Sequence, residues 1–156
     1  KDPYGQDLVA MIRDLGLEDG QVLLSTKKVE KQLLSFMYNM CDCTLNISDA
    51  EGFGLSTFES LSSGTPIVVT MTGGLQEQVT DGEEWFGVGL EPNSKAIIGS
   101  QDVPYIYEDR VSKEDFHAAL KKIHDKWVEI IDGVCEKNGS WEDRKNYNSW
   151  SLTKVS

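Results

Sequence analysis

Short apolar runs alternate with segments of helical periodicity along the first half of the chain, and this alternation constrains the fold more than any other feature. The apolar runs indicate buried strands at residues 22–24, 43–47 and 67–69. The helical segments occupy residues 7–15, 28–40, 55–63 and 75–80. Strands that alternate with helices and are apolar on both faces predict an α/β fold, with a parallel sheet flanked by helices.

Glycines and capping residues mark the expected helix boundaries. Gly16 and Gly64 are expected to end the first and third of these helices. Ser56 and Glu59 have the spacing of a capping box at the start of the third helix. The pattern is less regular over residues 83–112.

A long helix is expected near the C-terminus, with Ser112 and Asp115 as its cap. Its apolar stripe consists of Phe116, Leu120, Ile123, Trp127 and Ile130. The polar tail that follows contains Trp141, Tyr147 and Trp150. We expect these rings to pack a returning C-terminal helix; a platform for an acceptor molecule is the alternative.

Length and charge exclude several classes of protein. A chain of 156 residues suffices for one domain of ordinary size. Its 15 Lys and Arg against 26 Asp and Glu give a net charge of −11. The sequence shows no basic stripe that could bind nucleic acid or an anionic membrane. No apolar stretch approaches the roughly 20 residues of an integral membrane segment. A phosphate-bearing ligand would therefore have to be met locally, by backbone amides and a few cations.

The three cysteines are Cys41, Cys43 and Cys135. Their odd number, without the spacing of a disulfide framework, favours a reducing compartment, and we expect a cytoplasmic location. Cys41 and Cys43 have the spacing of a redox or metal pair, but no second cluster completes a metal site. We therefore expect ordinary buried or half-buried cysteines.

Two loops are the candidates for a ligand site, because parallel sheets bind ligands beyond the carboxyl ends of their strands. These loops, residues 48–54 and 70–74, are rich in glycine and small polar residues. Within the first, the glycines should place Glu51 in the loop and Glu59 inside the following helix. Between the two carboxylates lie free amides at a helix N-terminus, which attract anions. A nucleoside diphosphate sugar has the matching order of sugar hydroxyls, diphosphate and ribose hydroxyls.

The sequence from Asp42 through Val68 follows the pattern D-x(5)-S-x(2)-E-G-F-G-L-x(3)-E-x(4)-G-x-P-I-V. This pattern resembles the donor-binding half of group 1 (family four) glycosyltransferases, which are retaining enzymes of the GT-B fold. The E-x(7)-E spacing is that family's signature, and Gly73-Gly74 followed by Glu77 is similar to its next loop. The resemblance covers roughly residues 5–90.

The resemblance implies a role for each matching residue. Glu51, the candidate catalytic residue, would hold hydroxyls of the donor sugar and help to position the anomeric carbon. Glu59 would accept hydrogen bonds from the ribose. The donor-binding backbone would be that of Gly52, Phe53, Gly54 and Leu55, with Gly73 and Gly74 in the second loop. The glycine pair has two readings: a turn between strand and helix, or close approach of the backbone to a ligand.

The resemblance also implies the chemistry. The donor would be a nucleotide sugar of UDP or GDP, and neither a metal nor another cofactor is expected. Retention is ascribed in this family to attack on the same face of the sugar, with the departing diphosphate taking the acceptor's proton. A carboxylate nucleophile is then not required, and Glu51 is not assigned that role. The residues do not identify the acceptor.

Part of the family's pattern is not recognisable in this chain. The N-terminal acceptor lobe has no counterpart, nor has the first strand of the donor lobe, whose loop brings an Arg and a Lys to the diphosphate. We therefore expect a partial GT-B C-terminal domain, with a Rossmann-like donor-binding lobe at residues 1–137 and a tail or helix at residues 138–156. Alone, it should be inactive and bind the donor weakly.

Other classes of protein are possible for such a chain. The alternative function is a non-catalytic Rossmann-like module that binds a nucleotide or a sugar. A dehydrogenase or a P-loop enzyme is disfavoured, because the chain lacks G-x-G-x-x-G after the first predicted strand and G-x(4)-G-K-(S/T). A purely structural domain would leave the Glu–Gly–Glu constellation unexplained.

Overall fold

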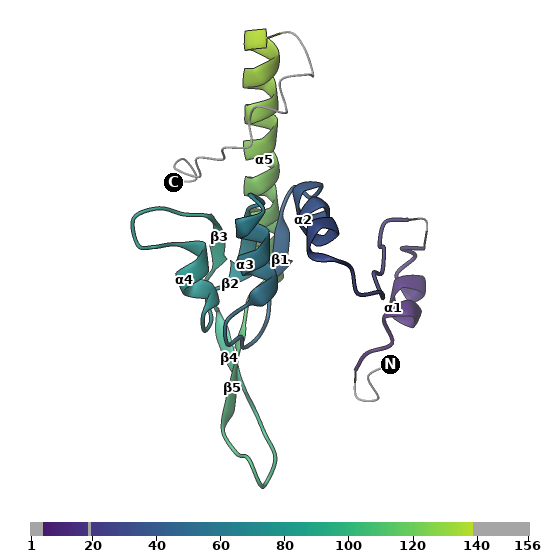
Figure 1. Cartoon of the computed structure of the whole chain (residues 1–156). Helices are drawn as coiled ribbons and strands as arrows, with labels where there is room; N and C mark the ends of the chain where they lie inside the picture. Colours follow the sequence, from purple (N-terminus) through teal and green to yellow (C-terminus); the bar gives the residue numbers. More distant parts are fainter. Residues whose placement is uncertain (1–4, 19, 139–156) are drawn as a thin grey trace. The chain divides into compact units, whose positions relative to one another are not determined.

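The structure, a computed structural model, describes residues 5–18 and 20–138 (Figure 1). It divides into two compact units, Lys1–Glu30 and Lys31–Ser156.

The first unit contains the expected helix α1, Leu8–Asp14. Asp7 caps it by accepting a hydrogen bond from the Ala10 N–H at 3.1 Å. The helix stops before Gly16, which adopts a positive φ of 68° as expected. This part of the prediction is confirmed.

The strand predicted at residues 22–24 is wrong. Val22, Leu23 and Leu24 have irregular backbone and are 39%, 86% and 47% exposed. A strand needs a neighbour to satisfy its N–H and C=O groups, and the described residues of this unit contain no other strand. An apolar run in the sequence is therefore not sufficient for a strand to form.

The second unit is built on a three-stranded parallel sheet in the order β1-β2-β3. Its strands are β1, Thr44–Asn46; β2, Ile67–Thr70; and β3, Gly87–Leu90. In register, Leu45 lies opposite Val68, and Val68 lies opposite Val88. The predicted α/β class with a parallel sheet is confirmed, although β3 was not predicted.

Helices cover both faces of the central strand. On one face, Ile67 and Val69 pack with Leu75 and Val79 of α4, Leu75–Val79, and with Leu61 of α3, Leu55–Ser62. On the other face, Val68 and Leu90 pack with Ala119 and Ile123 of α5, Lys113–Asn138. The remaining helix, α2, Lys31–Asn39, contacts α3. All four residues of β2 are buried, as expected for the middle strand of such a sheet.

The long helix α5 begins as predicted. The Ser112 hydroxyl accepts a hydrogen bond from the Asp115 N–H at 3.0 Å, and it lies 2.6 Å from Asp115 Oδ2. Phe116, Ile123 and Trp127 of the predicted stripe pack toward the sheet. Ile130, Trp141, Tyr147 and Trp150 lie outside the residues whose side chains are described, as does the predicted tail beyond Asn138. The boundary after residue 137 stays a prediction.

A two-stranded antiparallel hairpin, β4 (Ser94–Ile98) and β5 (Ile106–Arg110), extends from the unit between β3 and α5 (Figure 1). It forms a separate sheet, in which Ala96 lies opposite Glu108. This hairpin falls within residues 83–112, where the sequence shows no regular pattern. It matters for function because the C-terminal end of β5 contacts the first candidate loop.

Candidate functional site

The two candidate loops pack backbone against backbone at the carboxyl edge of the sheet. The Gly74 N–H donates to the Gly52 carbonyl at 3.1 Å. A Cβ atom at Gly73 would stand 1.7 Å from the Glu51 carbonyl oxygen, and one at Gly74 would stand 2.6 Å from that of Gly52. The close approach that the glycine pair permits is therefore between the two loops, a reading that neither sequence-based alternative contained.

The start of α3 is held by side chains from two helices. Gly54 precedes the helix in the left-handed region, with φ of 83°. Thr57 Oγ1 lies 2.7 Å from the Gly54 carbonyl oxygen and 2.5 Å from Gln78 Oε1. The Gln78 amide donates to the carbonyls of Phe53 and Gly54. Thr57 and Gln78 thus fix the backbone that leads into α3, and sequence analysis missed both.

The predicted capping box at the start of α3 is wrong. Gly54 occupies the N-cap position and has no side chain to cap with, and Ser56 lies inside the first turn. Glu59 accepts a hydrogen bond from the Tyr38 hydroxyl at 3.2 Å. The left-handed glycine starts the helix too early for Ser56 to act as its cap.

The N-terminus of α3 therefore has unpaired donors. The first bond into the helix runs from the Phe58 N–H to the Gly54 carbonyl at 3.1 Å. Within the part of the chain that the structure describes, no group accepts a hydrogen bond from the N–H groups of residues 55–57. Leu55 and Ser56 are exposed, so their free N–H groups and the positive end of the helix dipole are presented to an anion, whereas the N–H of the fully buried Thr57 is not.

The two carboxylates take the positions that the sequence predicts. Glu51 is half-buried in the loop, where its Oε1 accepts a hydrogen bond from the Gly52 N–H at 3.0 Å. Glu59 lies inside α3 and is exposed. Burial, and then the nearby charge of Glu59, raise the pKa of the Tyr38 hydroxyl. Placement in loop and helix is confirmed; the roles of the two side chains stay predictions.

Gly52 differs from the other glycines of the site. A Cβ atom placed there would meet nothing within 4 Å, and its φ is not positive. Packing within this unit therefore does not require glycine at position 52. Phe53 and Leu55, which follow it in the chain, are 53% and 69% exposed. Gly52, Phe53 and Leu55 are therefore accessible to a ligand, whereas Gly54 and Thr57 are buried.

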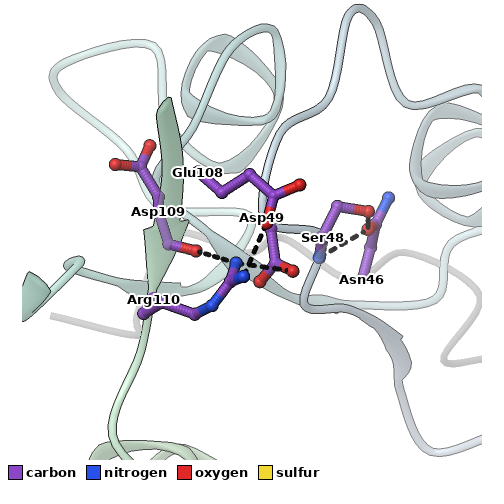
Figure 2. Close-up of polar contacts among 6 residues, drawn as sticks. All are labelled: Asn46, Ser48, Asp49, Glu108, Asp109 and Arg110. Atoms are coloured by element: carbon purple, nitrogen blue, oxygen red, sulfur yellow. Dashed lines mark hydrogen bonds and ion pairs between the residues drawn. The ribbon is translucent and has the colours of Figure 1, made fainter. Parts of the chain in front are cut away.

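A polar cluster at the beginning of the first loop was also missed by sequence analysis. Arg110 at the end of β5 pairs with Asp49, with 2.6 Å between Nη1 and Oδ2, and with Glu108, with 2.5 Å between Nη2 and Oε2 (Figure 2). The Asp109 N–H donates to the Asp49 carbonyl at 2.8 Å. No local motif signals this cluster, because it depends on the hairpin that the pattern did not reveal.

The cysteine prediction is correct for one residue and wrong for another. Cys43 is half-buried beside the sheet, and burial raises the pKa of its thiol. Cys41 is exposed, because it follows the end of α2, where its Sγ lies 3.2 Å from the Met37 carbonyl oxygen. The side chain of Cys135 lies outside the described part of α5.

The described residues contain neither a metal-binding cluster nor a membrane-spanning helix. Among residues 5–18 and 20–138, no three His, Cys, Asp or Glu side chains gather into a group that could hold a metal ion. None of the described helices has the length and apolarity needed to cross a membrane.

Fold and site together define a class and then a family. A parallel sheet covered by helices, with glycine-rich loops and an uncapped helix at its carboxyl edge, is the arrangement of Rossmann-like domains that bind ligands at that edge. A family model described as "Glycosyl transferases group 1" matches residues 2–123. The chain therefore belongs to the group 1 glycosyltransferase family, as the sequence pattern predicted.

Similar proteins cover the chain well but are much longer. A D-inositol 3-phosphate glycosyltransferase of Acidothermus cellulolyticus is 38% identical over 129 residues, which are 81% of this chain and 28% of that protein. D-inositol 3-phosphate glycosyltransferase 2 of Catenulispora acidiphila is 33% identical over 112 residues, 70% of this chain and 26% of that protein. A mannosylfructose-phosphate synthase of Agrobacterium fabrum is 37% identical over 112 residues, which are 69% of this chain and 24% of that protein. The chain thus spans about a quarter of the length of these curated relatives.

Proposed function

We propose that this chain is the donor-binding part of an enzyme that transfers a sugar from a nucleoside diphosphate sugar to an acceptor. The observation that carries the proposal is the uncapped N-terminus of α3, with Glu51 before it and Glu59 within it. Family membership and the names of the relatives support sugar transfer. The expected nucleoside diphosphate is UDP or GDP.

The proposed roles follow the order of groups along the loop and helix. The free amides of Leu55 and Ser56, which are exposed, face the diphosphate, since an anion is stabilised there by N–H donors and the dipole. Glu51 binds hydroxyls of the donor sugar, and Glu59 accepts hydrogen bonds from the ribose. Gly73 and Gly74 shape the site indirectly, by letting the second loop support the first.

The proposed reaction retains the configuration of the sugar and uses no metal. The acceptor oxygen forms its bond to the anomeric carbon as the bond to the diphosphate breaks, on the same face of the ring. The leaving diphosphate takes the acceptor's proton. In this reaction Glu51 positions the donor and forms no covalent bond to it.

The first experiment is titration calorimetry of the chain with UDP, GDP and ADP. We expect one of them to bind, and Glu59→Ala to weaken that binding at least tenfold, about the value of one charge-assisted hydrogen bond. Glu83→Ala, which removes an exposed carboxylate outside the two loops, serves as the matched control and should have no effect. Gly52→Ala should weaken binding while leaving the melting temperature unchanged, because its Cβ meets no protein atom within 4 Å.

The second experiment uses the longer protein that includes this chain and measures sugar transfer. Glu51→Ala should leave the affinity for the nucleoside diphosphate nearly unchanged and reduce turnover, because the nucleoside diphosphate lacks the sugar that Glu51 binds. Equal loss of nucleoside diphosphate binding in Glu51→Ala and Glu59→Ala would contradict the division of roles. Binding without transfer by the longer protein would instead favour the non-catalytic module.

A further inference from the structure

The β4–β5 hairpin is attached to the proposed donor loop at two atoms of one residue. The Asp49 carbonyl accepts the Asp109 N–H at 2.8 Å, and the Asp49 carboxylate pairs with Arg110 at 2.6 Å. One contact alone would leave the residue free to rotate about it. The backbone contact, together with the side-chain contact drawn in Figure 2, fixes both the position and the orientation of Asp49.

The same loop is held again on each side of Asp49. Before it, the Ser48 N–H and hydroxyl bond Asn46 Oδ1 at 3.3 and 2.6 Å, which ties the loop to the end of β1. After it, the Gly52 carbonyl accepts the Gly74 N–H at 3.1 Å. Glu51 lies between these attachments, two residues beyond Asp49. Its placement therefore depends on where the hairpin holds Asp49.

The ion pairs of this cluster have a geometry suited to positioning. The side chains of Arg110, Asp49 and Glu108 are 38%, 48% and 23% exposed. Ion pairs in contact with water contribute little to folding. The guanidinium, however, is a rigid fork, and here its two arms hold carboxylates from two different segments of the chain. We therefore expect these ion pairs to constrain the geometry of the loop more than they stabilise the fold.

We infer that Arg110 is a positioning residue: through Asp49, it and the hairpin hold the loop that presents Glu51 to the donor sugar. The inference rests on the proposed function. It adds to the site a residue far along the chain, which touches no donor atom itself. It also gives the hairpin a role as a brace for the donor loop.

The test uses five variants and two readouts. Arg110→Gln and Asp49→Asn break the pair from either side, and their combination completes a double-mutant cycle. Arg110→Lys keeps the charge without the fork. Lys95→Gln is the matched control, because Lys95 is a hairpin cation that pairs with Asp109 at 3.5 Å and is not paired with Asp49. The melting temperature of each variant is measured first.

The first readout is hydrogen exchange of the amides at residues 48–54, measured on the chain itself. Exchange should quicken in Arg110→Gln and in Asp49→Asn, and stay unchanged in Lys95→Gln. Asp49→Asn keeps the backbone acceptor and the side-chain shape, so it is the variant least prone to unfold. Unchanged exchange in both Arg110→Gln and Asp49→Asn would overturn the inference, whatever the protein binds.

The second readout is sugar transfer by the longer protein. We expect kcat to fall about ten- to a hundredfold in Arg110→Gln, the size of effect that misplacement by about 1 Å produces, with KM for the donor changed less than about twofold. The double variant should lose no more than the worse single variant, and Arg110→Lys should recover part of the loss. The inference would be overturned if the kcat losses of the two single variants multiplied in the double variant. It would also be overturned if Arg110→Gln lost no more kcat than Lys95→Gln.

The two readouts separate this inference from the proposed function. If the unaltered protein neither binds a nucleoside diphosphate nor transfers sugar, the proposed function fails, while hydrogen exchange still reports whether Arg110 holds the loop. If the unaltered protein binds and transfers, and Arg110→Gln matches it in both readouts, only the positioning role fails.

Discussion

Gly73 shows how a single missing side chain allows the site to assemble. Its φ is 49°, and the space that a Cβ would need is filled by the Glu51 carbonyl, 1.7 Å away. Backbone cannot move aside as a flexible side chain can. The two loops can therefore meet only if position 73 is glycine.

Gly73→Ala should lower the free energy of unfolding by about 2–4 kcal/mol, the sum of a strained positive φ and an overpacked contact. Urea denaturation measures the change. Gly64→Ala is the matched control: its φ is 81°, yet a Cβ there meets nothing within 4 Å, so it should cost only about 1–2 kcal/mol. Equal costs in the two variants would mean that the loops separate without penalty.

At this scale, the sequence predicted the contiguous part of the site and missed the rest. Glu51 and Glu59 were placed correctly because the glycines between them act locally on the backbone. Gln78 and Arg110 were missed because their contacts with the loop join residues distant in sequence. Side-chain pairs of that kind leave no periodicity or spacing to detect.

At the scale of elements, the start of α5 has an electrostatic consequence. Hydrogen bonds, first from the Ser112 hydroxyl and then from the Asn93 amide, hold the pKa of the Asp115 carboxyl below its ordinary value of 3.8. The carboxylate also lies in the first turn of the helix, where negative charge is favoured. The unfolded chain therefore takes up this proton at a higher pH than the folded chain does.

Asp115 should make the stability of the chain depend on pH in acid. Since its pKa is lower in the folded state, its contribution is complete above the unfolded-state pKa and is lost as the pH falls through the folded-state pKa. Asp115→Asn should thus lower the urea midpoint at pH 7 and flatten its decline below about pH 4. Glu114→Gln, in the same turn, is the control. A decline as steep in Asp115→Asn as in the unaltered chain would contradict this account.

The sequence missed β3 and the β4–β5 hairpin for two different physical reasons. β3 contains Gly87 and Gly89, and their missing side chains let the strand lie close to β2 and to Met71: a Cβ at Gly87 would stand 1.9 Å from the Ile67 carbonyl oxygen. Glycine there serves packing, although in a sequence it favours a loop. The hairpin lacks the two-residue turn that marks most hairpins, because seven residues, 99–105, join β4 to β5.

At the scale of the whole molecule, the net charge of −11 opposes the approach of any anionic ligand. A nucleoside diphosphate is repelled at long range and, in our proposal, attracted only in contact, by the amides that begin α3. Salt screens charges separated by more than about 10 Å at 0.1 M, and screens direct contacts much less. The long-range repulsion and the attraction in contact therefore respond differently to ionic strength.

Raising the salt concentration should thus not weaken binding of the nucleoside diphosphate, and between about 10 and 100 mM it should tighten it about two- to threefold, as the repulsion fades before the contact does. Calorimetry of the chain over this range measures the effect. The control is the uncharged nucleoside, whose affinity is measured by competition with the nucleoside diphosphate. Its affinity should show no trend with salt concentration, because it has no charge to repel. A tenfold weakening with salt would mean that cations dominate the site, and would contradict a diphosphate held by backbone amides against an acidic molecule.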